Sequence, residues 1–148
     1  MDIINTNNLN EARKQIQKLK KEGKEIIIKA QDDEFNRKIL EIRGCDVLLS
    51  PEMHTRKDKL KQRDSGLNEV LCKLAEKNNI KIGINLREIA KLPKKEKAII
   101  LSRIIQNISL CKRIGTQIVI YPKEYKKQDI LSFFLTLKSS TQLARKAF

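Results

Sequence analysis

Hydrophobic residues recur along this chain with two different periods, and the alternation between them predicts strands and helices in turn. Residues 80–86 alternate strictly between apolar and polar side chains, which is the pattern of a strand. Residues 25–30 form a β-branched run that is typical of a strand buried on both faces. Shorter strands are predicted at residues 3–4, 46–50 and 117–120.

The segments between these strands carry apolar residues at helical spacing. In the first of them, Leu9, Ala12, Ile16 and Leu19 recur every three or four residues, so a helix is predicted up to Lys21. Further helices are predicted at 34–43, 66–77, 94–114 and 128–137, with a last one from Thr141. Short polar residues precede the first three helices as N-caps, namely Asn7 or Asn8, Asp32 or Asp33, and Asp64 or Ser65.

Strands that alternate with helices are joined in parallel by right-handed crossovers, so we predict an α/β fold. The length of 148 residues indicates a single domain over residues 1–148. The strands fit half to two-thirds of a (β/α) barrel or a small open sheet, and their spacing does not decide between the two. Neither a G-x-G-x-x-G nor a G-x-x-x-x-G-K-[ST] motif occurs, so nucleotide binding of those kinds has no support.

The charge of the chain narrows the class of partner. Lys and Arg number 32 against 18 Asp and Glu, which gives a net charge of +14 at pH 7. Nucleic acid is the commonest polyanion that such a surface binds, and a solvated basic surface without a specific partner is the alternative. No stretch approaches the roughly 18 apolar residues of a membrane span, and the N-terminus has no signal pattern. We therefore expect a cytoplasmic protein with no membrane partner.

Residues suited to catalysis are scarce. His54 is the only histidine, which excludes a zinc site with several His ligands within this chain. We expect His54 to be a solvated loop residue or an RNA contact. Cys45, Cys72 and Cys111 are widely spaced and are expected to be small buried hydrophobic residues. The sequence thus predicts no catalytic residue, no metal and no cofactor bound by the protein itself.

A polybasic segment at residues 54–64 is the most informative part of the sequence. It follows a predicted strand, so it lies at the carboxyl edge of a parallel sheet, where ligands bind. Its cations are Arg56, Lys57, Lys59, Lys61 and Arg63, and Lys91, Lys94, Lys95 and Lys97 extend the basic surface. Arg87 follows the strand at 80–86 and emerges at the same edge, and the turn at 64–67 offers backbone N–H groups to phosphate. A solvated charge run is the alternative. Since aromatic residues are few, recognition of phosphate backbone and shape is expected.

Three stretches in order, residues 45–51, 63–75 and 79–87, resemble the ribonuclease P protein component 3 family. The resemblance implies a TIM-like (β/α) barrel, here expected to be shortened or incomplete at the N-terminus. It implies an accessory subunit of an enzyme whose catalytic core is an RNA that uses Mg²⁺ and removes the 5′ leader of precursor tRNA. The implied partners are the ribonuclease P RNA, protein component 2, the other protein subunits and, indirectly, precursor tRNA.

The resemblance also assigns residues. The basic positions that match those of the family are Arg37 and Lys38, Arg56 and Lys57 (or Arg63), Lys77 and Arg87, and Asp46 and Asp64 match acidic positions with a supporting role. Glu69 departs from the family, since many relatives have a His there. We therefore expect RNA contacts from Arg37, Lys38, Arg56, Lys57, Lys59, Lys61, Arg63, Lys77 and Arg87.

Three classes of function remain open at this point. The ribonuclease P subunit is the first. A stand-alone nucleic-acid-binding α/β domain is the second, and a barrel enzyme such as a metal-dependent phosphoesterase is the third. The single His argues against the enzyme, because metal-dependent phosphoesterase sites combine several ligating side chains.

Overall fold

One parallel sheet forms the centre of the molecule. The computed structural model describes residues 2–58 and 63–137. Its strands lie in the order β1-β2-β3-β4-β5. They are β1 (Ile3–Ile4), β2 (Ile27–Lys29), β3 (Val47–Leu49), β4 (Lys81–Asn85) and β5 (Ile118–Tyr121). Every neighbouring pair is parallel, so the α/β prediction is confirmed.

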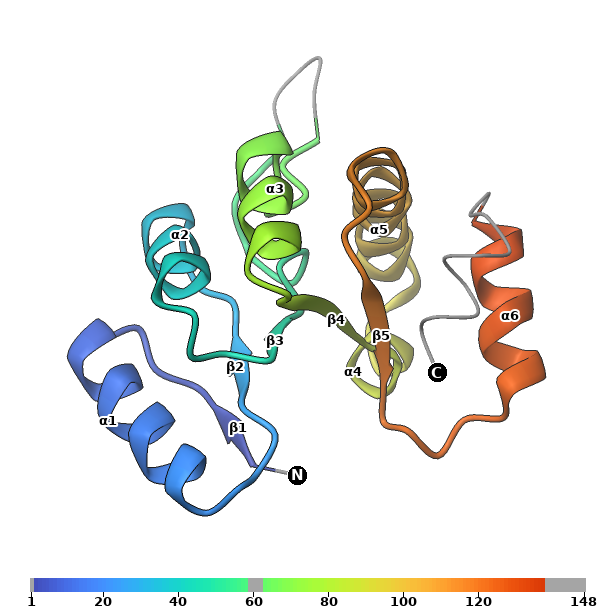
Figure 1. The fold of residues 1–148 in the computed structure, drawn as a ribbon. Helices are drawn as coiled ribbons and strands as arrows, with labels where there is room; N and C mark the ends of the chain where they lie inside the picture. Colours follow the sequence, from blue (N-terminus) through green and yellow to red (C-terminus); the bar gives the residue numbers. More distant parts are fainter. Residues whose placement is uncertain (1, 59–62, 138–148) are drawn as a thin grey trace.

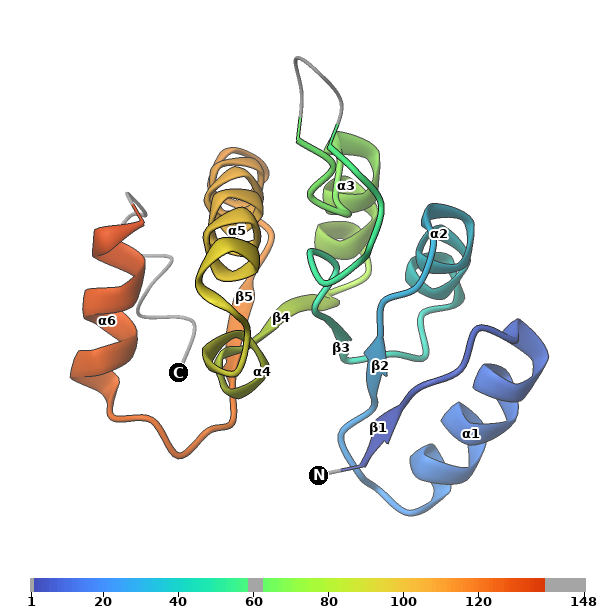
Figure 2. The ribbon, with the colours of Figure 1, turned by 180° about the vertical axis from the view of Figure 1, so that it is seen from behind.

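Helices connect each pair of consecutive strands, and one more helix follows the last strand. They are α1 (Leu9–Lys21), α2 (Asp33–Ile42), α3 (Glu69–Lys77), α4 (Leu86–Ala90), α5 (Lys94–Ile114) and α6 (Lys127–Thr136). Figure 1 shows α1, α2, α3, α5 and α6 in an arc around the strands, with α1 at one end of the arc and α6 at the other. Figure 2 shows the same arc from behind.

A closed TIM-like barrel is not observed. Closure requires the two edge strands of the sheet to pair. Within residues 2–58 and 63–137, β1 pairs with β2 and β5 pairs with β4, so the sheet is open at both edges. The order of the strands is nevertheless sequential, as it is in any run of βα units that coil in one direction.

The period of two along each strand divides its side chains between two apolar clusters. Ile28, Leu48, Ile82 and Ile118 belong to the large core that the helices cover. On the other face, Ile27, Val47, Leu49, Val119 and Tyr121 form a smaller cluster. The strict alternation at 80–86 places Ile80, Ile82 and Ile84 on the helix-covered face.

Helix boundaries follow the sequence closely where a cap is local. Asn8 and Asp32 accept the N-cap hydrogen bonds of α1 and α2, and α5 spans the predicted residues 94–114. The predicted start of the third helix was wrong. It begins at Glu69 with Asn68 as its N-cap, because residues 64–67 are engaged in other contacts described below. The short helix α4 was not predicted, and the predicted helix from Thr141 lies outside the described residues.

The buried side of α5 includes two polar residues. Arg103 and Asn107 are buried with Ile100, Ile104, Ile108 and Cys111, whereas Ile99 is 40% exposed. Cys45, Cys72 and Cys111 are free and buried, as predicted. No helix in the described part of the chain combines the length and hydropathy of a membrane span.

Candidate nucleic-acid interface

A buried arginine fixes the first half of the segment between β3 and α3, residues 52–67, which we call the basic loop. Arg103 of α5 is only 5% exposed. Its Nη1 atom donates to the backbone carbonyl oxygens of Glu52 and His54, both at 3.0 Å. Its Nη2 donates to the carbonyl of Arg56 at 2.9 Å, and its Nε donates to Asp58 Oδ1 at 3.2 Å. One guanidinium therefore organises four loop residues.

The second half of the basic loop is anchored to the next turn of α5. Gln106 Nε2 donates to the carbonyl oxygen of Arg63 at 3.0 Å, and Asn107 Nδ2 donates to that of Ser65 at 3.1 Å. Gly66 packs against Pro51, and a Cβ atom on this glycine would lie 1.9 Å from the Pro51 carbonyl oxygen. The two ends of the loop are thus held together, and residues 59–62 connect them.

Arg56 takes part in an ion-pair network. Its Nε donates to Asp64 Oδ2 at 2.9 Å, and its Nη2 lies 3.5 Å from Asp33 Oδ1 at the start of α2. The hydrogen bond from Arg56 holds the pKa of Asp64 below its usual value, although partial burial opposes this. Asp64 therefore joins the two halves of the basic loop through its pair with Arg56. Arg56, with its side chain 37% exposed, bridges loop and helix.

His54 is not the solvated residue that the sequence suggested. Its side chain is 10% exposed. Nε2 is hydrogen-bonded to the carbonyl oxygen of Asp64, and Nδ1 accepts from the backbone N–H of Arg56. Burial lowers the pKa of His54, so the imidazole tends to stay neutral. The only histidine thus fastens the two halves of the loop to each other.

The turn at residues 64–67 differs from the expected phosphate site. The N–H of Gly66 donates to Asp64 Oδ1 at 3.2 Å, so it is already used within the turn. Leu71 N donates to the Asn68 side chain at 2.9 Å, which caps the following helix. The prediction that this turn opens the helix was therefore wrong, and the N–H of Gly66 is not free to bind phosphate.

Arg87 emerges at the carboxyl end of β4, as the sequence predicted. It lies in the first turn of α4, and its side chain is 56% exposed. Nη2 lies 3.2 Å and 3.3 Å from the two carboxylate oxygens of Glu124, which follows β5. Asp46 contacts a different part of the sheet. Its Oδ2 accepts from the backbone N–H of Ile26 at 2.7 Å, which joins β2 and β3 at their amino ends.

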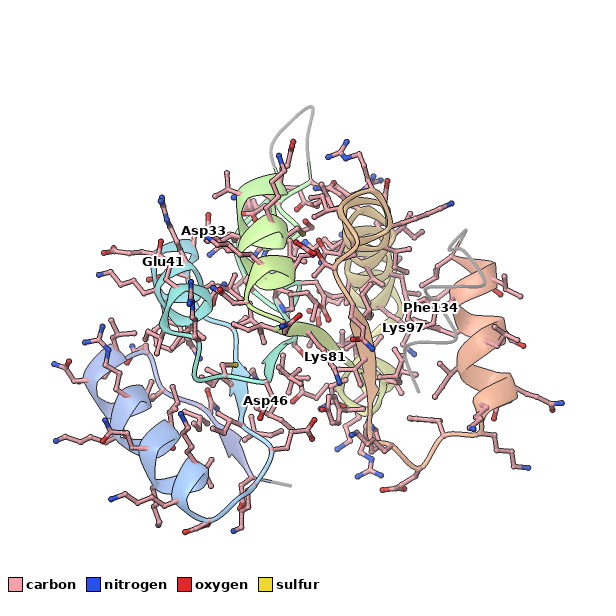
Figure 3. All side chains as sticks on the ribbon, viewed as in Figure 1. Asp33, Glu41, Asp46, Lys81, Lys97 and Phe134 are labelled. Carbon is pink, nitrogen blue, oxygen red and sulfur yellow. The ribbon has the colours of Figure 1, made fainter. Side chains whose placement is uncertain are left out.

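Most of the other predicted cations that the structure describes are exposed. Lys57 and Arg63 on the basic loop are exposed, and so are Lys91, Lys94 and Lys95, whereas Lys97 is half-buried. Lys59 and Lys61 lie outside the described residues. Figure 3 shows Asp33 near α3 and Lys97 on the side of the molecule nearer α6.

Three further predicted contacts lie away from the basic loop. Arg37 and Lys38 are on the exposed side of α2, where they pair with Glu41 at 3.1 Å and with Glu34 at 3.0 Å. Lys77 is the last residue of α3 and is exposed. Because this helix returns toward the amino ends of the strands, Lys77 lies at the opposite edge of the sheet from Arg87.

The arrangement offers positive charge and hydrogen-bond donors rather than a reactive group. In residues 2–58 and 63–137, no three side chains of His, Cys, Asp or Glu gather as metal ligands would. Glu52 is buried with both carboxylate oxygens unpartnered, and this burial raises its pKa to about 7. A side chain that is inaccessible in this way contacts no ligand at the surface.

Known proteins similar to this chain share one name. Ribonuclease P protein component 3 of Methanococcus vannielii is 35% identical to it over 117 residues, which cover 79% of this chain and 48% of that protein. The resemblance to component 3 is confirmed. Component 3 of Methanocaldococcus jannaschii is 26% identical over 127 residues, which cover 86% of this chain and 52% of that protein. This chain therefore spans about half the length of these component 3 relatives.

A solved structure agrees with the component 3 similarity. A chain in the cryo-EM structure of archaeal ribonuclease P with mature tRNA superposes with a TM-score of 0.78 at 25% sequence identity. The superposition covers 97% of this chain and 62% of that chain. No protein-family model matches the chain.

Sequence reasoning missed Arg103, Gln106 and Asn107. A signal was present, because Arg103 and Asn107 occupy positions that the 3.6-residue period assigns to the buried side of α5. A polar side chain at such a position must find partners. The sequence does not reveal that those partners are carbonyl groups more than 40 residues away.

Proposed function

We propose that this chain is a protein subunit of ribonuclease P that binds the catalytic RNA and supports 5′-leader removal from precursor tRNA without catalysing it. The similarity to component 3 over 117 residues is the observation that carries the proposal. The anchored basic loop agrees with it, because a loop fixed on α5 presents its cations in one orientation and loses little entropy on binding.

The primary RNA contacts in this proposal are Lys57, Arg63 and Arg87, together with Lys59 and Lys61, which lie outside the described residues. Arg56 is a secondary contact, because its pair with Asp64 is partly buried, whereas the pair between Arg87 and Glu124 is exposed. Arg37, Lys38 and Lys77 lie elsewhere and would contact other parts of the RNA. Each Lys or Arg that neutralises a phosphate releases counterions, which is the main source of affinity for such surfaces.

The partners follow from the same proposal. They are the ribonuclease P RNA, protein component 2 and the other protein subunits, with precursor tRNA met indirectly. The protein holds no cofactor, and Mg²⁺ serves the RNA. The compartment is the cytoplasm. The open five-stranded sheet would be a sector of the TIM-like barrel that the family resemblance implies.

Pull-down of the tagged chain from its own cells, with sequencing of the bound RNA, tests the proposal. We expect recovery of ribonuclease P RNA together with component 2. The purified chain should not cleave precursor tRNA alone, and it should raise the activity of its RNA when component 2 is added. Cleavage by the chain free of RNA, or recovery of unrelated RNAs only, would contradict the proposal.

A further inference from the structure

The outer side of α1 presents a cationic surface that lies apart from the basic loop. Ala12, Ile16 and Leu19 bury the inner side of this helix in the core. The exposed cations on the remaining sides are Arg13, Lys14, Lys18, Lys20 and Lys21, which we call the α1 surface. In Figure 3, nitrogen-tipped side chains radiate from the outer side of this helix.

No carboxylate of the described residues forms an ion pair with any cation of the α1 surface. Glu11, the one acidic residue of the helix, is hydrogen-bonded to Thr6 at 2.8 Å and to Gln15 at 3.3 Å instead. Neighbouring helices differ in this respect. Both Arg37 and Lys38 of α2 have carboxylate partners four residues away, and in α3 Lys73 pairs with Glu69 at 2.7 Å.

Helix stability does not account for this distribution. Cations in the last turn complement the helix dipole, which explains Lys18, Lys20 and Lys21. Arg13 and Lys14 lie outside that turn and gain nothing from it. Lys14 and Lys18 are four residues apart, where like charges repel and destabilise a helix. A counter-charge from outside the chain would relieve this repulsion.

We propose that the α1 surface is a second contact for the phosphate backbone of RNA, distinct from the basic loop. The inference rests on the proposed function. Charge complementarity carries it, since the side chains offer cations without aromatic groups for stacking, so backbone rather than base recognition is expected. A membrane surface fits less well, because the apolar side of α1 is buried in the core and none is left to insert.

The two surfaces lie far apart. In both Figure 1 and Figure 2, α1 lies low in the view at one end of the arc, whereas α3, which follows the basic loop, lies high in the view. The protein would therefore contact RNA at two separate places on its surface.

A charge-removal variant with a matched control tests the inference on the full chain. The test variant carries Lys14→Gln, Lys18→Gln and Lys21→Gln. The control carries Lys24→Gln, Lys73→Gln and Arg113→Gln, which also removes three charges, each from an exposed residue that is already in an ion pair. Affinity for ribonuclease P RNA is measured by filter binding at several salt concentrations.

We expect the α1 variant to lose affinity about tenfold and to reduce the log–log salt slope by about 2, at roughly 0.7–0.9 for each phosphate that is no longer neutralised. The control should lose less than about threefold. Equal losses in the two variants would overturn the inference, since the effect would then be one of net charge. The inference would also be overturned if the α1 variant bound phosphatidylglycerol vesicles more weakly than the wild type while its affinity for RNA was unchanged.

A third variant separates this inference from the proposed function. Lys57→Gln with Arg63→Gln should weaken RNA binding independently of α1, and the losses should add. If only this loop variant weakens binding, the α1 inference is wrong and the proposed function stands. If the wild-type chain does not bind ribonuclease P RNA at all, the proposed function fails and the inference fails with it.

Discussion

The guanidinium of Arg103 is the side chain on which the basic loop depends most. Its donors satisfy three backbone carbonyls and one carboxylate in a part of the molecule where water does not replace them. Backbone carbonyls buried without a partner are costly, so the residue acts on the loop through the interior rather than at the surface.

We expect Arg103→Met to lower the free energy of unfolding by about 2–4 kcal/mol, because several buried acceptors lose their donor at once. Arg103→Lys should recover part of the loss, since an ammonium cannot reach all the acceptors that the planar fork reaches. Urea denaturation measures both. Arg113→Met is the control, and as an exposed arginine it should change stability by less than about 1 kcal/mol. Equal effects at the two positions would contradict the role of Arg103.

Glu52 gives the protein a pH dependence of its own. Burial raises its pKa to about 7 from the usual 4.5, with a smaller contribution from Glu88. Between these two values the folded chain holds a proton that the unfolded chain releases, so stability falls as pH rises from 4.5 through 7. Glu52→Gln removes this loss, and we expect it to stabilise the protein by about 2–3 kcal/mol at pH 8.

Thermal melts across this pH range check the Glu52 prediction, through the difference in stability between the variant and the wild type at each pH. This difference is needed because His54 makes stability rise with pH, whereas Glu52 makes it fall. The lowered pKa of His54 means that the unfolded chain binds a proton first as pH falls below 6.5, which destabilises the fold on the acid side. Glu96→Gln, at an exposed position, is the control. If the Glu52→Gln variant gains no more stability over wild type at pH 8 than at pH 4, the prediction is refuted.

Arg87 lies in a short helix directly after β4, so regular secondary structure fixes its backbone. Arg87→Ala should weaken RNA binding by about 1.5–3 kcal/mol, the value of a charge-assisted hydrogen bond, against under about 1 for Lys57→Ala. Arg87→Lys should retain only part of the wild-type RNA affinity, because lysine lacks the two-pronged guanidinium that binds phosphate. Since the pair with Glu124 is exposed, the melting temperature should change little. A large drop in melting temperature with unchanged RNA affinity would disprove the contact.

At the scale of elements, the base of the basic loop is buried and closely packed around Gly66. Gly66 has a φ of +79°, a conformation that other residues adopt at a cost, and it touches the Pro51 backbone. Because this contact and the hydrogen bonds to Gln106 and Asn107 hold residues 63–66 in a loop, α3 begins only at Glu69.

Gly66→Ala should destabilise the protein by about 2–4 kcal/mol, because the new methyl group meets the Pro51 carbonyl and the φ angle is strained. Gly115→Ala is the matched control, since Gly115 also has a positive φ of 95° but has no atom within 4 Å of an added Cβ. The control should cost only about 1–2 kcal/mol. If both substitutions cost the same in equilibrium unfolding, close packing at Gly66 is not the cause.

Elements were predictable from the sequence where their signals were local. The caps Asn8 and Asp32 and the period of α5 are each contained within one segment. The start of α3 was not predictable in this way. Asp64 is a residue type that often caps helices, but here it forms an ion pair with Arg56 instead. The same holds for the interface. The sequence placed Lys57 and Arg87 at the carboxyl edge. It did not show which arginines form ion pairs, because their carboxylate partners, such as Asp33 and Glu124, come from distant elements.

At the scale of the whole molecule, the number of neutralised phosphates should set the response of RNA binding to salt. The candidates at the carboxyl edge are Arg56, Lys57, Lys59, Lys61, Arg63 and Arg87. If about six phosphates are neutralised, log K against log[salt] should have a slope of roughly −4 to −5, and contacts from α1 would steepen it by about 2. The measurement is affinity for ribonuclease P RNA between low and moderate salt, with the loop variant at Lys57 and Arg63 as a control that flattens the slope. A wild-type slope near zero would mean that the net charge of +14 contributes solubility rather than binding.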